Sequence, residues 1–111
     1  MRDEKKMMSL LGFAKKAGKV IIGTDMAVES VRSGRKNAVK LFLLASDASA
    51  NTEKRINNTS EYYGVPTIVT QAKKSELAHT VGSVSEISVI GVTDKGFADA
   101  MLKTVELDNN A

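Results

Sequence analysis

The sequence predicts a single α/β domain, a three-layer α/β/α sandwich in which about five helices cover a four-stranded mixed sheet. Helical and strand patterns alternate along the chain, which favours helices on both faces of a sheet. The run 41–44, Leu-Phe-Leu-Leu, is apolar on both faces, as in a central strand covered from both sides. The 111 residues suffice for one domain spanning 1–111.

The first helix is expected over 4–17, because apolar residues recur there on one helical face. These residues are Met7, Leu10, Leu11 and Ala14. Gly18 follows the last turn, where a left-handed residue commonly ends a helix. A short β-branched strand is then expected over Val20–Ile22.

The second helix is expected over 25–33, with Thr24 or Asp25 as its N-cap and Gly34 at its end. Its buried stripe consists of Ala27, Val28 and Val31. The next apolar run, 39–45, is interrupted only by Lys40 and predicts the central strand.

The remaining elements follow from the same patterns. They are a helix over 52–63, a strand over 67–70, a helix over 74–81, a strand over 87–92 and a final helix capped by Thr93 or Asp94. The third helix is expected to direct Ile56 and Tyr63 inward. Residues 108–111 have the composition of a loose tail.

Composition argues against several function classes. The chain has no Cys and one His, His79, and no cluster of acidic residues, so we expect no catalytic constellation, metal site or cofactor. The first residues are too charged for a signal peptide. No segment approaches the roughly 18 apolar residues of a membrane span. These features are compatible with a reducing cytoplasm and give no support for an enzyme.

Charge is unevenly distributed along the chain. The formal net charge is +3. Residues 1–40 contain ten Lys or Arg and four Asp or Glu, whereas residues 41–111 contain six and nine. A basic segment on a mildly acidic remainder is typical of a protein that presents one face to a polyanion, and RNA is the polyanion we expect.

The turn Gly23-Thr24-Asp25 is the first candidate binding site. It leads from a strand into a helix, whose first N–H groups and partial positive charge favour anions. Gly23 allows close approach, and Thr24 and Asp25 can hydrogen-bond bases or sugars. We expect the neighbouring basic side chains to neutralise phosphates around this turn. They are Lys15, Lys16, Lys19, Arg32, Arg35 and Lys36.

The loop before the fourth strand is the second candidate site. It is small and partly apolar, so it can pack against an extruded base. Its candidate residues are Gly82, Ser83, Val84, Ser85 and Ile87. The pattern places the three Phe residues, 13, 42 and 97, in the core and leaves Tyr62 and Tyr63 partly exposed. Recognition of a folded RNA by shape and backbone is therefore favoured over stacking on a single strand.

Several short motifs, taken together and in order, resemble the L7Ae/L30e family of ribosomal-type proteins, closest to its bacterial YlxQ-type branch. They are Ala17-Gly18-Lys19-Val20, Gly23-Thr24-Asp25, the run 40–49, Tyr62-Tyr63-Gly64-Val65-Pro66, Glu76-Leu77-Ala78 with Gly82, and the run 92–98. The resemblance extends from Leu10 to Ala100.

The resemblance implies a non-enzymatic, cytoplasmic protein that binds kink-turn RNA and is associated with ribosomes or translation. In the family, a Gly-x-Asn-Glu turn meets the sheared G·A pairs, a Lys follows one turn later, and the loop before the last strand holds a flipped base. Gly23 matches this pattern. Asp25, Met26 and Glu29 replace the Asn, the Glu and the Lys, which favours another RNA or contact dominated by the backbone.

Two alternatives remain open at this point. The basic face is equally suited to an acidic protein, in which case the chain is an interaction adaptor on the translation machinery. The fold also serves as the substrate-recognition domain of RNA-modifying enzymes, although no catalytic domain is attached here. For all three functions we expect a monomer without membrane contact.

Overall fold

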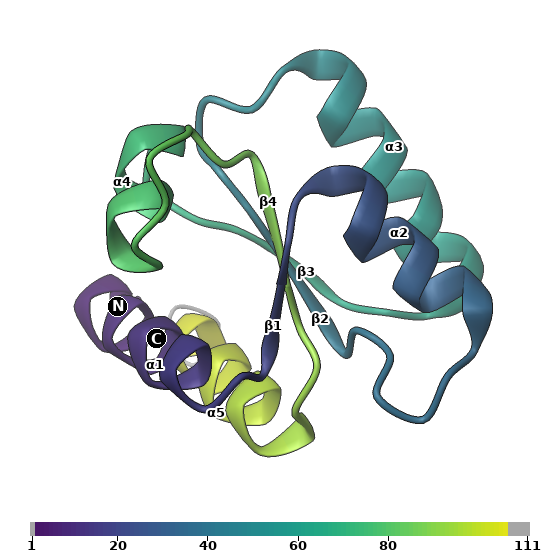
Figure 1. Cartoon of the computed structure of the whole chain (residues 1–111), viewed down its shortest axis with the longest axis horizontal. Helices are drawn as coiled ribbons and strands as arrows, with labels where there is room; N and C mark the ends of the chain where they lie inside the picture. The colour runs from purple at the N-terminus through teal and green to yellow at the C-terminus, as the bar shows by residue number, and fades with distance from the viewer. Residues whose placement is uncertain (1, 107–111) are drawn as a thin grey trace.

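The computed structural model describes residues 2–106, and the expected tail, 108–111, lies outside them. Five helices alternate with four strands, as predicted (Figure 1). The elements are α1 (Glu4–Lys16), β1 (Val20–Ile22), α2 (Thr24–Ser33), β2 (Leu41–Leu44), α3 (Ala50–Tyr63), β3 (Thr67–Val69), α4 (Lys74–Thr80), β4 (Val89–Val92) and α5 (Lys95–Glu106).

The four strands form one mixed sheet in the order β1-β4-β2-β3. Strand β4 is antiparallel to both of its neighbours, and β2 is parallel to β3. Helices α2 and α3 cover one face of the sheet, and α1, α4 and α5 cover the other (Figure 1). This arrangement confirms the predicted three-layer α/β/α sandwich.

The core divides into two clusters, one on each side of the sheet. Alternate residues of β2 enter different clusters: Leu41 and Leu43 face α1, α4 and α5, whereas Phe42 and Leu44 face α2 and α3. All four are buried. The Leu-Phe-Leu-Leu run is therefore apolar throughout because side chains of a strand point alternately to two covered faces.

Two strands begin two residues later than predicted, because the first residues expected in them make other bonds. The Val39 N–H donates to Ser30 Oγ of α2, 3.1 Å away, and β2 begins two residues later. The Ile87 N–H donates to the Lys74 carbonyl, 3.2 Å away, and β4 begins at Val89. Both residues are buried, so their apolar character reflects burial and not strand pairing.

Of the three Phe residues expected in the core, Phe13 is exposed. Phe13 is 59% exposed, because it lies two residues, or about 200° of helical rotation, beyond the buried Leu11 of the same helix. Tyr63, the last residue of α3, is 42% exposed and packs edge-on against Tyr62. Phe42 is buried, as predicted.

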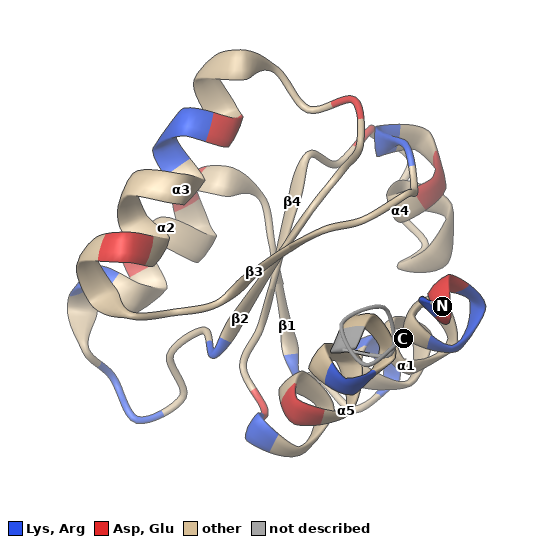
Figure 2. Ribbon diagram, turned by 180° about the vertical axis from the view of Figure 1, so that it is seen from behind, with Lys and Arg blue, Asp and Glu red and all other residues tan. Residues whose placement is uncertain are grey.

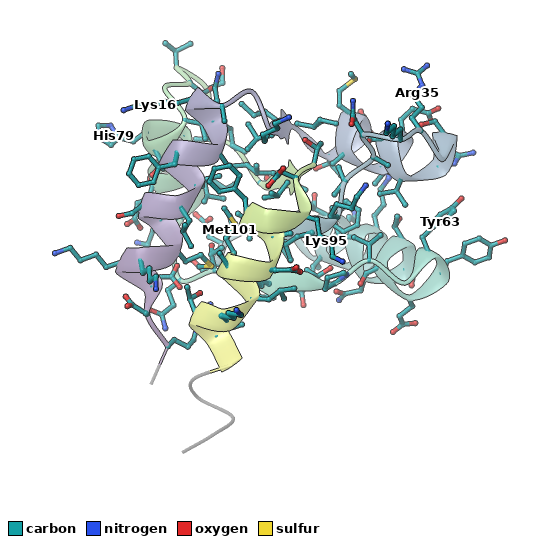
Figure 3. All side chains as sticks on the ribbon, turned by 90° about the horizontal axis from the view of Figure 1, so that it is seen from below. Lys16, Arg35, Tyr63, His79, Lys95 and Met101 are labelled. Carbon is teal, nitrogen blue, oxygen red and sulfur yellow. The ribbon has the colours of Figure 1, made fainter. Side chains whose placement is uncertain are left out.

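No helix between residues 2 and 106 combines the length and the apolar character needed to cross a lipid bilayer. Within the same residues, His, Asp and Glu side chains do not gather in groups of three that would hold a metal ion. His79 is exposed on α4 (Figure 3).

Candidate nucleic-acid interface

The strand directions give the sheet two chemically different ends. Strands β1, β2 and β3 all finish at the end where α2, α3 and α4 begin, at the top of Figure 1. We call this the upper end. At the opposite, lower end, α1, α2 and α3 finish and β1, β2 and β3 begin. The N-termini of α2, α3 and α4 therefore meet at the upper end, and the C-termini of α1, α2 and α3 lie at the lower end, where α5 begins.

The α2 entrance, which we define as Gly23, Thr24 and Asp25, lies at the upper end. The expected N-cap is wrong: Gly23 occupies that position with φ 105°, and Thr24 is already helical. The Gly23 N–H donates to the Val89 carbonyl at 3.0 Å, which anchors the turn to β4. A positive φ of this size is readily adopted by glycine and strained for other residues.

No side chain of the described residues caps α2. The two neighbouring helices differ: Ser49 accepts from the Thr52 N–H of α3 at 3.2 Å, and Glu76 accepts from the Lys73 N–H at the start of α4 at 3.1 Å. A glycine cap leaves the first N–H groups of α2 available to an external acceptor, and the helix dipole favours an anion there.

Asp25 forms an ion pair with Arg55 of α3. The arginine therefore neutralises a carboxylate that would repel a phosphate at the α2 entrance. The sequence pattern placed Arg55 on the outer face of its helix and gave no sign of this contact, because the two residues lie 30 positions apart. The pair is solvent-exposed, so its contribution to stability is small.

The 82–87 loop connects α4 to β4, and its end reaches the α2 entrance. Gly82 and Ser83 remain with α4 through bonds to the His79 and Ala78 carbonyls. The chain then enters β4, whose first residue, Val89, accepts from Gly23. The start of β4, which follows the second candidate site, therefore contacts the α2 entrance, whereas Gly82 and Ser83 lie at the C-terminal end of α4.

Within this loop, apolar residues have opposite environments. Val84 is fully exposed, whereas Ile87 is 5% exposed and belongs to the core beneath α4. The expectation that Ile87 contacts a ligand is therefore wrong, because the core covers almost all of its side chain. The Ser83 hydroxyl donates to the Ser85 carbonyl at 2.9 Å and holds the exposed tip in a turn.

The predicted basic residues do not surround the α2 entrance, so that expectation is also wrong. Lys15, Lys16 and Lys19 precede β1, and Arg35 and Lys36 follow α2, which places both groups at the lower end. Arg32 lies in the last turn of α2. The entrance and this end are separated by the ten residues of α2, about 15 Å of helix. In Figure 2, blue segments lie along the lower end, and others lie on α3, on α4 and near the N-terminus.

A groove of about 650 Å³ runs along α2 and joins the two ends. Its walls include Ile21 of β1, Met26 and Glu29 of α2, and Arg35 and Lys36 from the following loop. Met26 is 65% exposed although it is apolar. The groove therefore begins beside the α2 entrance and ends among basic side chains.

The fold and the placement of these sites define a small α/β domain of the ribosomal-protein type. Residues 5–102 match the model of the ribosomal protein L7Ae/L30e/S12e/Gadd45 family. The chain belongs to this family, which confirms the resemblance found in the sequence.

Similar proteins cover most of the chain. The RNA-binding protein YlxQ of Bacillus subtilis (strain 168) is 35% identical over 97 residues, which span 87% of this chain and 92% of that protein. The large ribosomal subunit protein eL30 of Methanosarcina mazei is 30% identical over 91 residues, 82% of each chain. A solved structure of a Bacillus halodurans protein of unknown function superposes with TM-score 0.81 at 31% identity, covering 91% of this chain and 97% of that one.

Proposed function

We propose that this chain is a non-enzymatic, cytoplasmic RNA-binding protein associated with the ribosome or with translation. Its target is a structured RNA of the kink-turn type, and it binds as a monomer. The family and the relatives named RNA-binding protein and ribosomal subunit protein support the RNA-binding part of this proposal.

The observation that carries the proposed site is the uncapped start of α2. Gly23 offers no side chain to the first turn, so the backbone N–H groups there can donate to phosphate or to base oxygens. Thr24 adds a hydroxyl, and Arg55 offsets the charge of Asp25. The exposed Val84 and Met26 supply apolar surface on which an extruded base can pack.

The family's polar side chains at positions 25, 26 and 29 are absent here, so we expect the backbone of the RNA to dominate its recognition. Met26 has no acceptor for a guanine amino group, and the Asp25 carboxylate has no donor. Affinity for a kink-turn should therefore depend steeply on salt, with a slope that reflects about three to six phosphate contacts.

An electrophoretic mobility-shift panel tests this proposal. It compares a kink-turn hairpin, a plain duplex and ribosomal RNA fragments at low salt. The variant Thr24→Asp adds a negative charge at the α2 entrance, and it should weaken kink-turn binding about tenfold, or about 1.4 kcal/mol. Val69→Asp makes the same change at a half-exposed position on β3, the opposite edge strand, and should leave binding unchanged.

Two results would contradict the proposal. Absence of binding to all three RNAs at low salt would reject RNA binding itself. Equal effects of Thr24→Asp and Val69→Asp would reject the α2 entrance as the site. Capture of acidic proteins that survives ribonuclease digestion would favour the adaptor function instead.

A further inference from the structure

The lower end of the sheet carries the greatest concentration of positive charge in the chain. Seven of the 16 Lys and Arg residues lie on three segments that meet there, 15–19, 35–40 and 93–95. We call these seven residues the basic end. They are Lys15, Lys16, Lys19, Arg35, Lys36, Lys40 and Lys95. The three segments contain one acidic residue, Asp94.

Backbone hydrogen bonds fix these segments side by side. The Lys40 N–H donates to the Val92 carbonyl at 2.7 Å, and the Thr93 N–H donates to the Lys19 carbonyl at 2.9 Å. Lys19 and Lys40 therefore flank the end of β4, and Lys95 begins α5 three residues after Val92. Seen from below in Figure 3, Lys16 on α1, Lys95 and Arg35 lie across this end, with Tyr63 of α3 on the Arg35 side.

Helix stabilisation explains only part of this charge. Cations near a helix C-terminus interact favourably with its dipole, which accounts for Lys15 and Lys16 at the end of α1. Lys95 is the first residue of α5, where a positive charge opposes the dipole. Lys19 and Lys40 flank strands, which have little net dipole. Interaction with a helix dipole therefore does not explain the positions of these three lysines.

The side chains of the basic end are mostly exposed, which suits them to phosphate groups. All of its members except Lys40 are exposed, and Lys40 is half-buried because its ammonium donates to the Ala38 carbonyl at 3.0 Å. Exposed ammonium groups on flexible stems act as point charges and suit phosphates without reading sequence. Spread over the ends of β1, β4 and β2, they fit a repeating row of phosphates such as a duplex presents.

The α2 groove gives this surface a continuous path from the α2 entrance. The groove starts at Met26 and ends at Arg35 and Lys36, so an RNA held at the entrance can extend along α2 to the basic end. We propose that the basic end binds the phosphate backbone of a double-stranded arm of the same RNA that occupies the α2 entrance. This inference rests on the proposed function.

A length series of RNAs tests the inference. The short RNA is a kink-turn hairpin with minimal stems, and the long RNA has one stem extended by a helical turn of duplex. The basic-end variant K19Q/R35Q/K36Q/K95Q spares Lys40, which bonds the loop. The control variant K5Q/K6Q/K54Q/K103Q removes the same charge from exposed positions on α1, α3 and α5. Circular dichroism verifies the fold of both.

The wild-type protein should bind the long RNA at least tenfold more tightly than the short one. The basic-end variant should lose this gain and bind both RNAs equally, while the control variant keeps it. For the long RNA, the slope of log K against log salt should fall by about 0.9 for each phosphate contact removed, up to about 3.6 for four.

The two proposals fail differently in this experiment. Loss of short-RNA binding in Thr24→Asp reports on the α2 entrance and leaves the length effect to be judged separately. The inference is overturned if the basic-end variant keeps the gain, or if it loses affinity equally for both RNAs. It is also overturned if an excess of plain duplex binds the basic end without lowering the affinity gain of the long RNA. Binding of acidic proteins to the basic end that survives ribonuclease digestion would overturn it as well.

Discussion

Gly91 should not tolerate a methyl group, and the structure gives the reason. It lies in the middle of β4 between Ile21 of β1 and Phe42 of β2, with its face toward α2 covered by Val39. A Cβ added at Gly91 would lie 2.4 Å from Val39 Cγ2 and 3.0 Å from its Cγ1. Favourable carbon contacts begin near 3.5 Å, so the added methyl group and the Val39 side chain would have to move apart by about 1 Å.

Neither neighbour can move easily. Strand β4 is paired on both sides, and Val39 is 2% exposed within the α2–α3 cluster. Overpacking of this kind costs about 1–3 kcal/mol, so Gly91→Ala should lower the free energy of unfolding by about 2 kcal/mol. The midpoint of thermal unfolding should fall by about 5 °C for each kcal/mol.

A double-mutant cycle isolates the contact. Val39→Ala alone removes two buried methyl groups, at about 0.8 kcal/mol each. In the double variant the new methyl at position 91 occupies the space that Val39 vacates. The double variant should therefore lose about 1–2 kcal/mol less free energy of unfolding than the sum of the losses in the two single variants. Urea unfolding followed by circular dichroism provides the readout, since the chain has no Trp. Strict additivity would show that Gly91 and Val39 do not interfere.

Three further predictions concern the candidate sites. Ile87→Ala should lower the free energy of unfolding by about 2–5 kcal/mol in urea titrations, because the residue is buried and not in a ligand site; a change below 1 kcal/mol would contradict its burial. Asp94 Oδ2 accepts from the Phe97 N–H at 2.9 Å as the cap of α5. Asp94→Asn should keep that cap, and hence stability within about 0.5 kcal/mol, while it tightens low-salt binding of plain duplex; unchanged duplex affinity would contradict the basic end. Arg55→Ala should alter stability by less than about 1 kcal/mol yet weaken kink-turn binding in a mobility-shift assay, because the Asp25 charge is then uncompensated.

The fold could be predicted because the local and global signals agree. Gly34 and Gly64 end helices in the left-handed conformation, as their positions in the sequence indicated. The alternation of helices and strands led to the correct layers. Strand starts were less accurate, because Val39 and Ile87 are buried like strand residues but bond to a side chain or to another element.

The candidate site was predicted less well, because charge along a sequence does not reveal its position in space. Lys19 is four residues from Gly23, but β1 separates them by about 13 Å and puts them at opposite ends of the sheet. Conversely, Arg55 is distant in sequence and adjacent in space to Asp25. Helical periodicity does not determine such contacts, which arise from the packing of α2 on α3.

According to the proposed function and the further inference, the two ends of the sheet have separate binding roles. The upper end offers helix N-termini and exposed apolar side chains, which suit close contact with a folded RNA element. The lower end offers exposed charge, which suits a phosphate backbone without regard to sequence. Because the basic groups are at the lower end, strong salt dependence and specific recognition should reside in different residues.

The most direct test follows the backbone amide signals of the isotope-labelled protein during titration with kink-turn RNA at physiological ionic strength. Binding at the uncapped start of α2 predicts the largest shifts at the N–H groups of Thr24, Asp25 and Met26, together with signals of the 82–87 loop. Shifts confined to α3, α4 or the β3 edge, with the first turn of α2 unchanged, would contradict it.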